Sequence, residues 1–189
     1  MNFNEYRPLA LRTAKMFDSQ HSNLQHAILG LMTEAGEFAT EVKRRFAYGK
    51  PMTDEMQAHM REELGDICWY VPLALYALGK DALPALSDDV RAEFADMTLV
   101  ETTVALGAMV GGIATIPNIP QSKLESDGDI FMLAAIVHLV DELALLIGTT
   151  GDTVRAENIA KLRKRFPEAY SDAAAEARAD KGGVDARNS

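Results

Sequence analysis

The sequence is poor in cysteine and in positive charge, and each shortage excludes a class of protein. A single cysteine, Cys68, stands among 189 residues. No disulfide can therefore form within the chain, and no cluster of thiolates can hold zinc. Acidic residues outnumber basic ones by 28 to 19, which gives a formal net charge of −9. This excess argues against a general nucleic-acid-binding protein, which needs a basic surface.

Long apolar runs are also scarce. The first residues show no basic stretch followed by an apolar core, so we expect no export signal. The uncharged run from Thr102 to Gln121 contains two prolines, which favours a buried helix over a membrane span. Together with the lone cysteine, these features lead us to expect a cytoplasmic protein that binds neither nucleic acid nor membrane.

Apolar residues recur at helical spacing along most of the chain, without the alternation that is typical of strands. A chain that is 48% hydrophobic and 25% charged can bury a sizeable core. We predict an all-α helical bundle, with a single domain over 1–170 and a flexible polar tail over 171–189. Ser22 and Gln25 have the spacing of a capping box at the start of the second helix. The expected helices are 3–18, 22–47, 53–78, 88–116, 131–147 and 153–165.

Two short acidic motifs stand on consecutive expected helices. Glu34 and Glu37 form one pair, and Glu63 and Asp66 form the other. Residues three apart lie on one helix face, and at about 100° per residue both pairs border the apolar stripe of their helix. If the two stripes pack together, four carboxylates converge. Their repulsion and desolvation are costly unless a cation compensates.

A divalent cation is the natural compensation for such a cluster. Carboxylate oxygens suit Mg²⁺ or Mn²⁺ better than zinc or copper. Gly36 and Gly65 each precede the last acid of a pair, and we expect them to let the two helices approach closely. Each glycine costs about 1 kcal/mol relative to alanine inside a helix. Alternatively, the acids belong to a solvated helix face, which is the usual interpretation of a single Glu-x-x-Glu pair.

These motifs together resemble the MazG-like family of all-α nucleoside triphosphate pyrophosphohydrolases. The segments LGLMTEAGEFATEVKRRF and EELGDICWYV carry the resemblance, with the later element NIAKLRKRFP at 158–167. The family pattern is Glu-x-x-Glu, a spacer, and Glu-x-x-Asp, followed by an Asn-x-x-Lys-Leu-x-x-Arg element near the end of the domain. The resemblance covers residues 22–80 and 150–167.

The resemblance implies an enzyme that hydrolyses a nucleoside triphosphate to the monophosphate and pyrophosphate. It implies that the four acids, Glu34, Glu37, Glu63 and Asp66, are catalytic and hold two or three Mg²⁺ ions, with Mn²⁺ as a substitute. In a two-metal arrangement one ion lowers the pKa of a bound water, which attacks the α-phosphorus. Glu37 is our choice for the group that accepts the proton of this water.

Further residues are candidate substrate contacts. The resemblance implies phosphate contacts for Lys161 and Arg165, and a phosphate or sugar contact for Asn158. Trp69 is a candidate for stacking on the base, although tryptophan in a helical protein often belongs to the core. Lys43 belongs to a basic cluster at the end of its helix, which either contacts phosphate or compensates the helix dipole.

Residues 81–149 are longer than the middle of compact family members. They predict an extra helical pair before the C-terminal helix, which we interpret as a degenerate second copy of the first pair. Phage-encoded members include a branch that favours guanine deoxynucleotides, so dGTP or GTP is a candidate substrate and the host cytoplasm a candidate location. The helix over 131–147 has few polar positions, so we expect a homodimer or homotetramer.

Two other classes of protein fit part of the pattern. A ferritin-like di-metal bundle uses carboxylates on four helices but needs Glu-x-x-His on two of them. No histidine in this sequence has a glutamate three residues before it. A non-catalytic helical interaction protein would leave the clustered acids unexplained. Binding of Mg²⁺ and release of pyrophosphate distinguish these alternatives from the enzyme.

Overall fold

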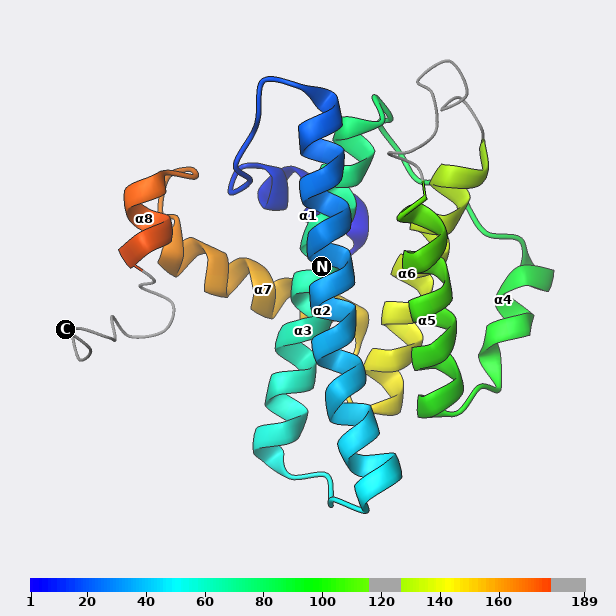
Figure 1. The fold of residues 1–189 in the computed structure, drawn as a ribbon. Helices are drawn as coiled ribbons and strands as arrows, with labels where there is room; N and C mark the ends of the chain where they lie inside the picture. Colours follow the sequence, from blue (N-terminus) through cyan, green and yellow to red (C-terminus); the bar gives the residue numbers. More distant parts are fainter. Residues whose placement is uncertain (116–126, 178–189) are drawn as a thin grey trace.

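The computed structural model describes residues 1–115 and 127–177 (Figure 1). These residues form eight helices and contain no strand, which confirms the predicted all-α class. The helices are α1 (Phe3–Leu11), α2 (Gln20–Tyr48), α3 (Asp54–Ala77), α4 (Asp88–Ala95), α5 (Leu99–Ile113), α6 (Asp127–Leu146), α7 (Gly151–Arg165) and α8 (Asp172–Ala177).

The long helices α2 and α3 form an antiparallel pair at the centre of the molecule (Figure 1). Gly49 ends α2 in the left-handed region, with φ at 62°, and its N–H donates to the carbonyl of Arg44. Thr53 begins α3, because its side chain accepts a hydrogen bond from the N–H of Met56. Both signals were visible in the sequence, so the predicted end of the second helix and start of the third are confirmed within one residue.

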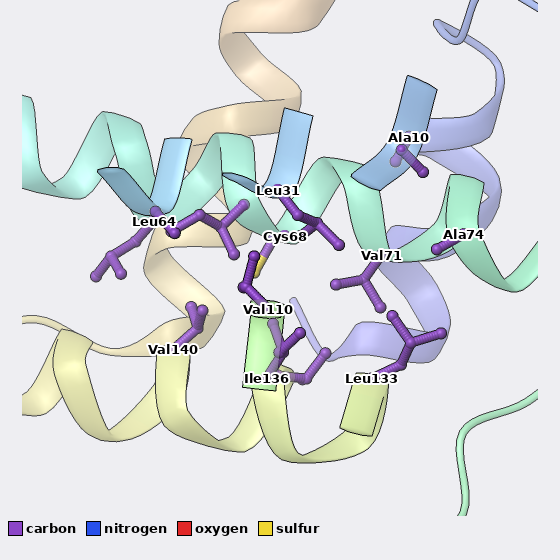
Figure 2. Packing of buried hydrophobic residues seen from close by; sticks show 14 of the residues in the cluster. Ala10, Leu31, Leu64, Cys68, Val71, Ala74, Val110, Leu133, Ile136 and Val140 are labelled. Carbon is purple, nitrogen blue, oxygen red and sulfur yellow. The ribbon is translucent and has the colours of Figure 1, made fainter. Parts of the chain in front are cut away.

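The remaining long helices surround this pair. α6 packs against α3, α5 packs against α2 and α6, and α7 contacts α3 from another side (Figure 1). Figure 2 shows side chains of α6 pointing toward α3 in a shared buried core, to which α1, α2 and α5 also contribute. The labelled contributors from these two helices are Leu133, Ile136 and Val140 of α6, and Leu64, Cys68, Val71 and Ala74 of α3. The predicted extra helical pair is thus present as α5 and α6.

The position of α6 in the fold explains why this helix has so few polar residues. Its apolar side chains, from Leu133 to Ala144, are mostly buried by helices of the same molecule. The scarcity of polar positions in this helix therefore does not require a second copy of the chain. The homodimer or homotetramer stays a prediction.

The predicted first helix, 3–18, is too long, because tertiary contacts hold the chain after α1 in an irregular path. The indole N–H of Trp69 donates to the hydroxyl of Thr13 at 2.9 Å. The side chain of Asn23 binds the backbone N–H and C=O of Phe17 at 2.8 and 3.1 Å. These partners lie far along the chain or on the next helix, so the local pattern could not reveal them.

Two other predicted boundaries are wrong. α2 begins at Gln20 with Ser19 as its N-cap, so the proposed capping box of Ser22 and Gln25 is not used. The single helix expected over 88–116 is two helices, because Thr98 and Glu101 form a capping box that starts α5 after a break. A capping box supplies partners for backbone N–H groups at a new helix start, which stabilises the interruption.

Parts of other predictions fall outside the described residues. The run from Thr102 to Gln121 lies partly in α5, and its end belongs to the segment 116–126 that the structure does not describe. Within the tail expected over 171–189, only α8 is described beyond Ser171. Among the described helices, none alone has the length and hydropathy of a membrane span, although the bent pair Gly128–Leu146 and Gly151–Arg165 meets that test jointly.

Candidate functional site

The two acidic pairs converge where α2 and α3 run side by side. Carboxylate oxygens of Glu34, Glu63 and Asp66 lie within 4.8 Å of one another. Glu37 joins the cluster through a second triad, in which ligand atoms of Glu37, His59 and Glu63 lie within 4.8 Å. The structure therefore brings together all four acids that the helical spacing predicted.

Glu63 is the buried centre of this cluster, with only 4% of its surface exposed. Burial, a hydrogen bond with Glu34 and the charge of Asp66 raise the pKa of Glu63 from 4.5 to about 8. Burial also raises the pKa of Glu34. Two neighbouring acids that resist ionisation mark a position where positive charge would be strongly stabilised.

Helix α7 supplies a positive charge to the cluster. The ammonium of Lys161 lies 2.6 Å from both carboxylate oxygens of Asp66 and 3.4 Å from Oε1 of Glu62. Burial opposes the charge of Lys161, but the neighbouring Asp66 outweighs it and raises the pKa of the lysine. For Asp66, burial raises the pKa despite the opposing charge of Lys161. Glu62 also lines the cavity.

Asn158 lies behind the acids rather than in front of them. Its side-chain amide donates to Oδ1 of Asp66 at 2.8 Å, and its oxygen accepts from the hydroxyl of Tyr6 at 2.7 Å. The residue is buried and is not among those that line the cavity. It orients Asp66, and this position does not match the direct substrate contact that the resemblance implied.

The two glycines of the motifs have different surroundings. A Cβ on Gly65 would lie 3.0 Å from Cβ and 3.1 Å from Nδ2 of Asn158, so this glycine makes room for α7. A Cβ on Gly36 would meet no described atom within 4 Å. The expectation that both glycines let α2 approach α3 is therefore wrong. Gly30 of α2 instead makes room for α3, because a Cβ there would overlap the ring of Tyr70.

A cavity of about 510 Å³ opens beside the acids. Its lining includes the charged residues Glu34, Glu37, Asp66, Lys161 and Arg165 and several aromatic rings. Four of these rings, those of Phe17, His26, Trp69 and Tyr70, form a connected cluster, which we call the aromatic side of the cavity. A cavity that joins charged and flat apolar surfaces suits a ligand that carries both phosphate and base.

The aromatic side chains hold one another at edge-to-face angles. The ring of Trp69 lies 4.7 Å from that of Tyr70, and His26 lies 5.7 Å from Tyr70. Burial raises the pKa of Tyr70 to about 12 and lowers the pKa of His26. Trp69 lines the cavity and also holds the loop after α1 through its hydrogen bond to Thr13, so it has a structural role as well as a position from which it can contact a ligand.

One predicted substrate contact lies away from the cavity, and some residues that line the cavity were not predicted. Lys43 is exposed on α2 and is not among the residues that line the cavity. His26 lies about two helical turns before Glu34, so the sequence carried a weak signal for it. Phe17 reaches the cavity from an irregular segment, for which no periodic pattern exists.

The donor chemistry of the cluster fits hard divalent cations. Its first triad is made of oxygen atoms alone, which Mg²⁺ and Mn²⁺ prefer. Burial raises the pKa of the Cys68 thiol to about 12, and this residue is not part of the cluster. The arrangement can thus neutralise and position a polyanion only with bound cations, because the acids by themselves repel phosphate.

Residues 22–96 match the model of the MazG nucleotide pyrophosphohydrolase domain. The matched segment contains all four acids and ends with α4, so Lys161 and Arg165 on α7 lie outside it. Comparisons with curated proteins and with solved structures found no match.

Proposed function

We propose, from the match of residues 22–96 to the MazG nucleotide pyrophosphohydrolase domain, that the chain hydrolyses a nucleoside or deoxynucleoside triphosphate to the monophosphate and pyrophosphate in the presence of Mg²⁺. The observation that carries the proposal is the convergence of Glu34, Glu63 and Asp66, with Lys161 beside them, at one cavity. Its volume falls within the roughly 300–1,000 Å³ that is typical of small-molecule sites.

In this proposal the four acids hold two or three Mg²⁺ ions, and Mn²⁺ substitutes for them. When bound, the ions supply positive charge for the phosphates and lower the pKa of a coordinated water. Water oxygen bonds to the α-phosphorus, the bond from that phosphorus to the bridging oxygen breaks, and pyrophosphate leaves. Glu37 is the exposed member of the cluster, and we assign to its carboxylate the proton that the water releases.

Residues of α7 have two roles in the proposal. Lys161 and Arg165 line the cavity and bind the β- and γ-phosphates. Once a bound cation compensates the negative charge of Asp66, Lys161 is free to leave Asp66 and contact a phosphate. Asn158 is a positioning residue, because its amide holds Oδ1 of Asp66.

The aromatic side of the cavity accommodates the base. Trp69 and His26 offer ring surfaces beside the charged groups, and aromatic stacking tolerates any base. Guanine nucleotides, dGTP or GTP, are the substrates that we propose to test first. Preference for guanine needs hydrogen-bond partners for the base edge, so a comparison among nucleotides decides it.

We also propose that the chain assembles as a homodimer or homotetramer. Large apolar side chains are exposed on α2, where Leu29 is 63% and Met32 is 50% exposed. Neighbouring exposed apolar residues are characteristic of interaction surfaces. Sedimentation at several protein concentrations tests this proposal, and a monomer throughout would contradict it.

The decisive experiment measures pyrophosphate release from all common nucleoside and deoxynucleoside triphosphates with Mg²⁺, with Mn²⁺ and with a chelator. We expect metal-dependent release that Glu37→Gln and Asp66→Asn abolish. Glu93→Gln on α4 is the matched control, since this residue is exposed and does not line the cavity. Release of no pyrophosphate from any nucleotide would overturn the proposal. Silence in both this assay and Mg²⁺ calorimetry would favour an interaction protein.

A further inference from the structure

A histidine that the hydrolysis proposal does not use lies between two buried acids. His59 stands on α3, one helical turn before Glu63, and its Nε2 lies 2.8 Å from Oε1 of Glu63. Its Nδ1 lies 3.4 Å from Oε1 of Glu41 on α2. The side chains of Glu41 and Glu63 are 7% and 5% exposed, so both contacts are made to nearly buried carboxylates.

A carboxylate on each side of an imidazole ring, as around His59, is also the arrangement found at many metal-binding histidines. In such sites one ring nitrogen binds the metal while the other donates to a carboxylate, which fixes the ring. Here Glu41 stands at the Nδ1 side, and Arg44 holds Glu41 in turn at 3.0 Å. The Nε2 side faces Glu63, with a carboxylate oxygen of Glu37 completing a triad whose atoms all lie within 4.8 Å.

The spacing also fits shared coordination. Two ligands at right angles, each about 2.1 Å from an ion, are about 3 Å apart. The separation of 2.8 Å between Nε2 of His59 and Oε1 of Glu63 is close to that value. The same separation is equally good for a direct hydrogen bond, so the two possibilities predict different behaviour only when a metal is added.

We propose that Glu37, His59 and Glu63 form a mixed nitrogen–oxygen site for a transition-metal dication, with Glu63 shared between this site and the all-oxygen triad of Glu34, Glu63 and Asp66. Imidazole favours Mn²⁺, Co²⁺ or Zn²⁺ over Mg²⁺, because these ions accept nitrogen ligands more readily. The inference rests on the proposed function only in sharing Glu37 and Glu63, and its test requires no turnover.

The test uses Mn²⁺ alone and pulsed electron paramagnetic resonance. We expect nitrogen coupling from the imidazole in the wild-type chain, and its loss in His59→Gln. His138→Gln is the matched control, since this histidine on α6 also lies one turn from a glutamate, at 3.9 Å from Glu142, and we expect its coupling to match the wild type. Absence of nitrogen coupling in the wild-type chain, or its persistence in His59→Gln, would overturn the proposal.

Calorimetry with Co²⁺ and Mg²⁺ supplies a second readout. We expect His59→Gln to weaken Co²⁺ binding at least about 10-fold, with Mg²⁺ affinity changed much less. Glu41→Gln, which replaces the carboxylate beside Nδ1 by a neutral amide, should weaken Co²⁺ binding by about 10–100-fold. Equal loss for both metals would contradict a nitrogen ligand. Circular dichroism verifies that each variant folds, and His59→Asn replaces any His59→Gln protein that does not.

Pyrophosphate release by the wild-type chain with Mg²⁺, measured in parallel, separates the two proposals. Release without nitrogen coupling would leave the hydrolysis proposal standing and remove the mixed site. Nitrogen coupling without release from any nucleotide would support the mixed site and remove the hydrolysis proposal.

Discussion

Replacement of Glu63 by glutamine should stabilise the metal-free protein at alkaline pH and not at acidic pH. The pKa of Glu63 rises from 4.5 to about 8 in the folded chain, and burial is the main cause. Protonation of this group favours the folded state fully below pH 4.5, and the contribution is lost as the pH rises to 8. The resulting cost of ionisation is about 4 kcal/mol at pH 8 and below about 1 kcal/mol at pH 5.

Glutamine keeps the shape of the carboxyl group but cannot ionise. It weakens the ion-pair contact with His59 and the hydrogen bond with Glu34, at about 1 kcal/mol for each. The net gain for Glu63→Gln is therefore about 2 kcal/mol at pH 8, which corresponds to a rise of about 4–8 °C in Tm for a chain of this length. At pH 5 the same variant should lose about 1 kcal/mol, so the sign of the effect reverses.

The assay is urea or thermal unfolding in the presence of a chelator at pH 5 and pH 8. The comparison of Glu63→Gln with the wild-type chain isolates this group, since every other titrating residue is common to both. Glu93→Gln, an exposed residue of α4, should change the free energy of unfolding by less than about 0.5 kcal/mol at either pH. The reasoning is refuted if Glu63→Gln destabilises the chain equally at both values.

Other substitutions test the α7 contacts, the glycines and the aromatic side of the cavity. Lys161→Met should lower kcat/KM for the nucleotide by about 10–100-fold and tighten Mg²⁺ binding in calorimetry, because the ammonium occupies Asp66; weaker Mg²⁺ binding would contradict this. Gly65→Ala should destabilise the chain by about 1–3 kcal/mol, because its Cβ meets the asparagine of α7. Gly36→Ala, with open space around it, should stabilise by up to about 1 kcal/mol, and equal effects at the two glycines in urea unfolding would argue against the described packing. Trp69 is the single tryptophan of the chain, so its fluorescence should change when a non-hydrolysable nucleotide analogue binds; an unchanged spectrum at saturation would place the base elsewhere.

Several features of the candidate site were predictable because they depend on local geometry. Helical spacing puts Glu34 and Glu37 on one face of α2, and it puts Glu63 and Asp66 on one face of α3. The apolar stripe of each helix predicts which faces pack together. The same local rules predicted the end of α2 at Gly49 and the start of α3 after Thr53. They failed where a distant partner decides the backbone path, as Trp69 does for the loop after α1.

By itself the sequence determined the helical class, the pairing of acids on two consecutive helices and the excess of negative charge that calls for a cation. Periodicity of 3.6 residues is enough for these conclusions, because each depends on neighbours within a few turns. Only the tertiary structure decided that Lys161 reaches Asp66 across 95 residues of chain, and that Gly65 accommodates Asn158. It also decided that His59 stands between two buried acids. The crossing angles and offsets of packed helices set such contacts, and these depend on the whole core rather than on any one segment.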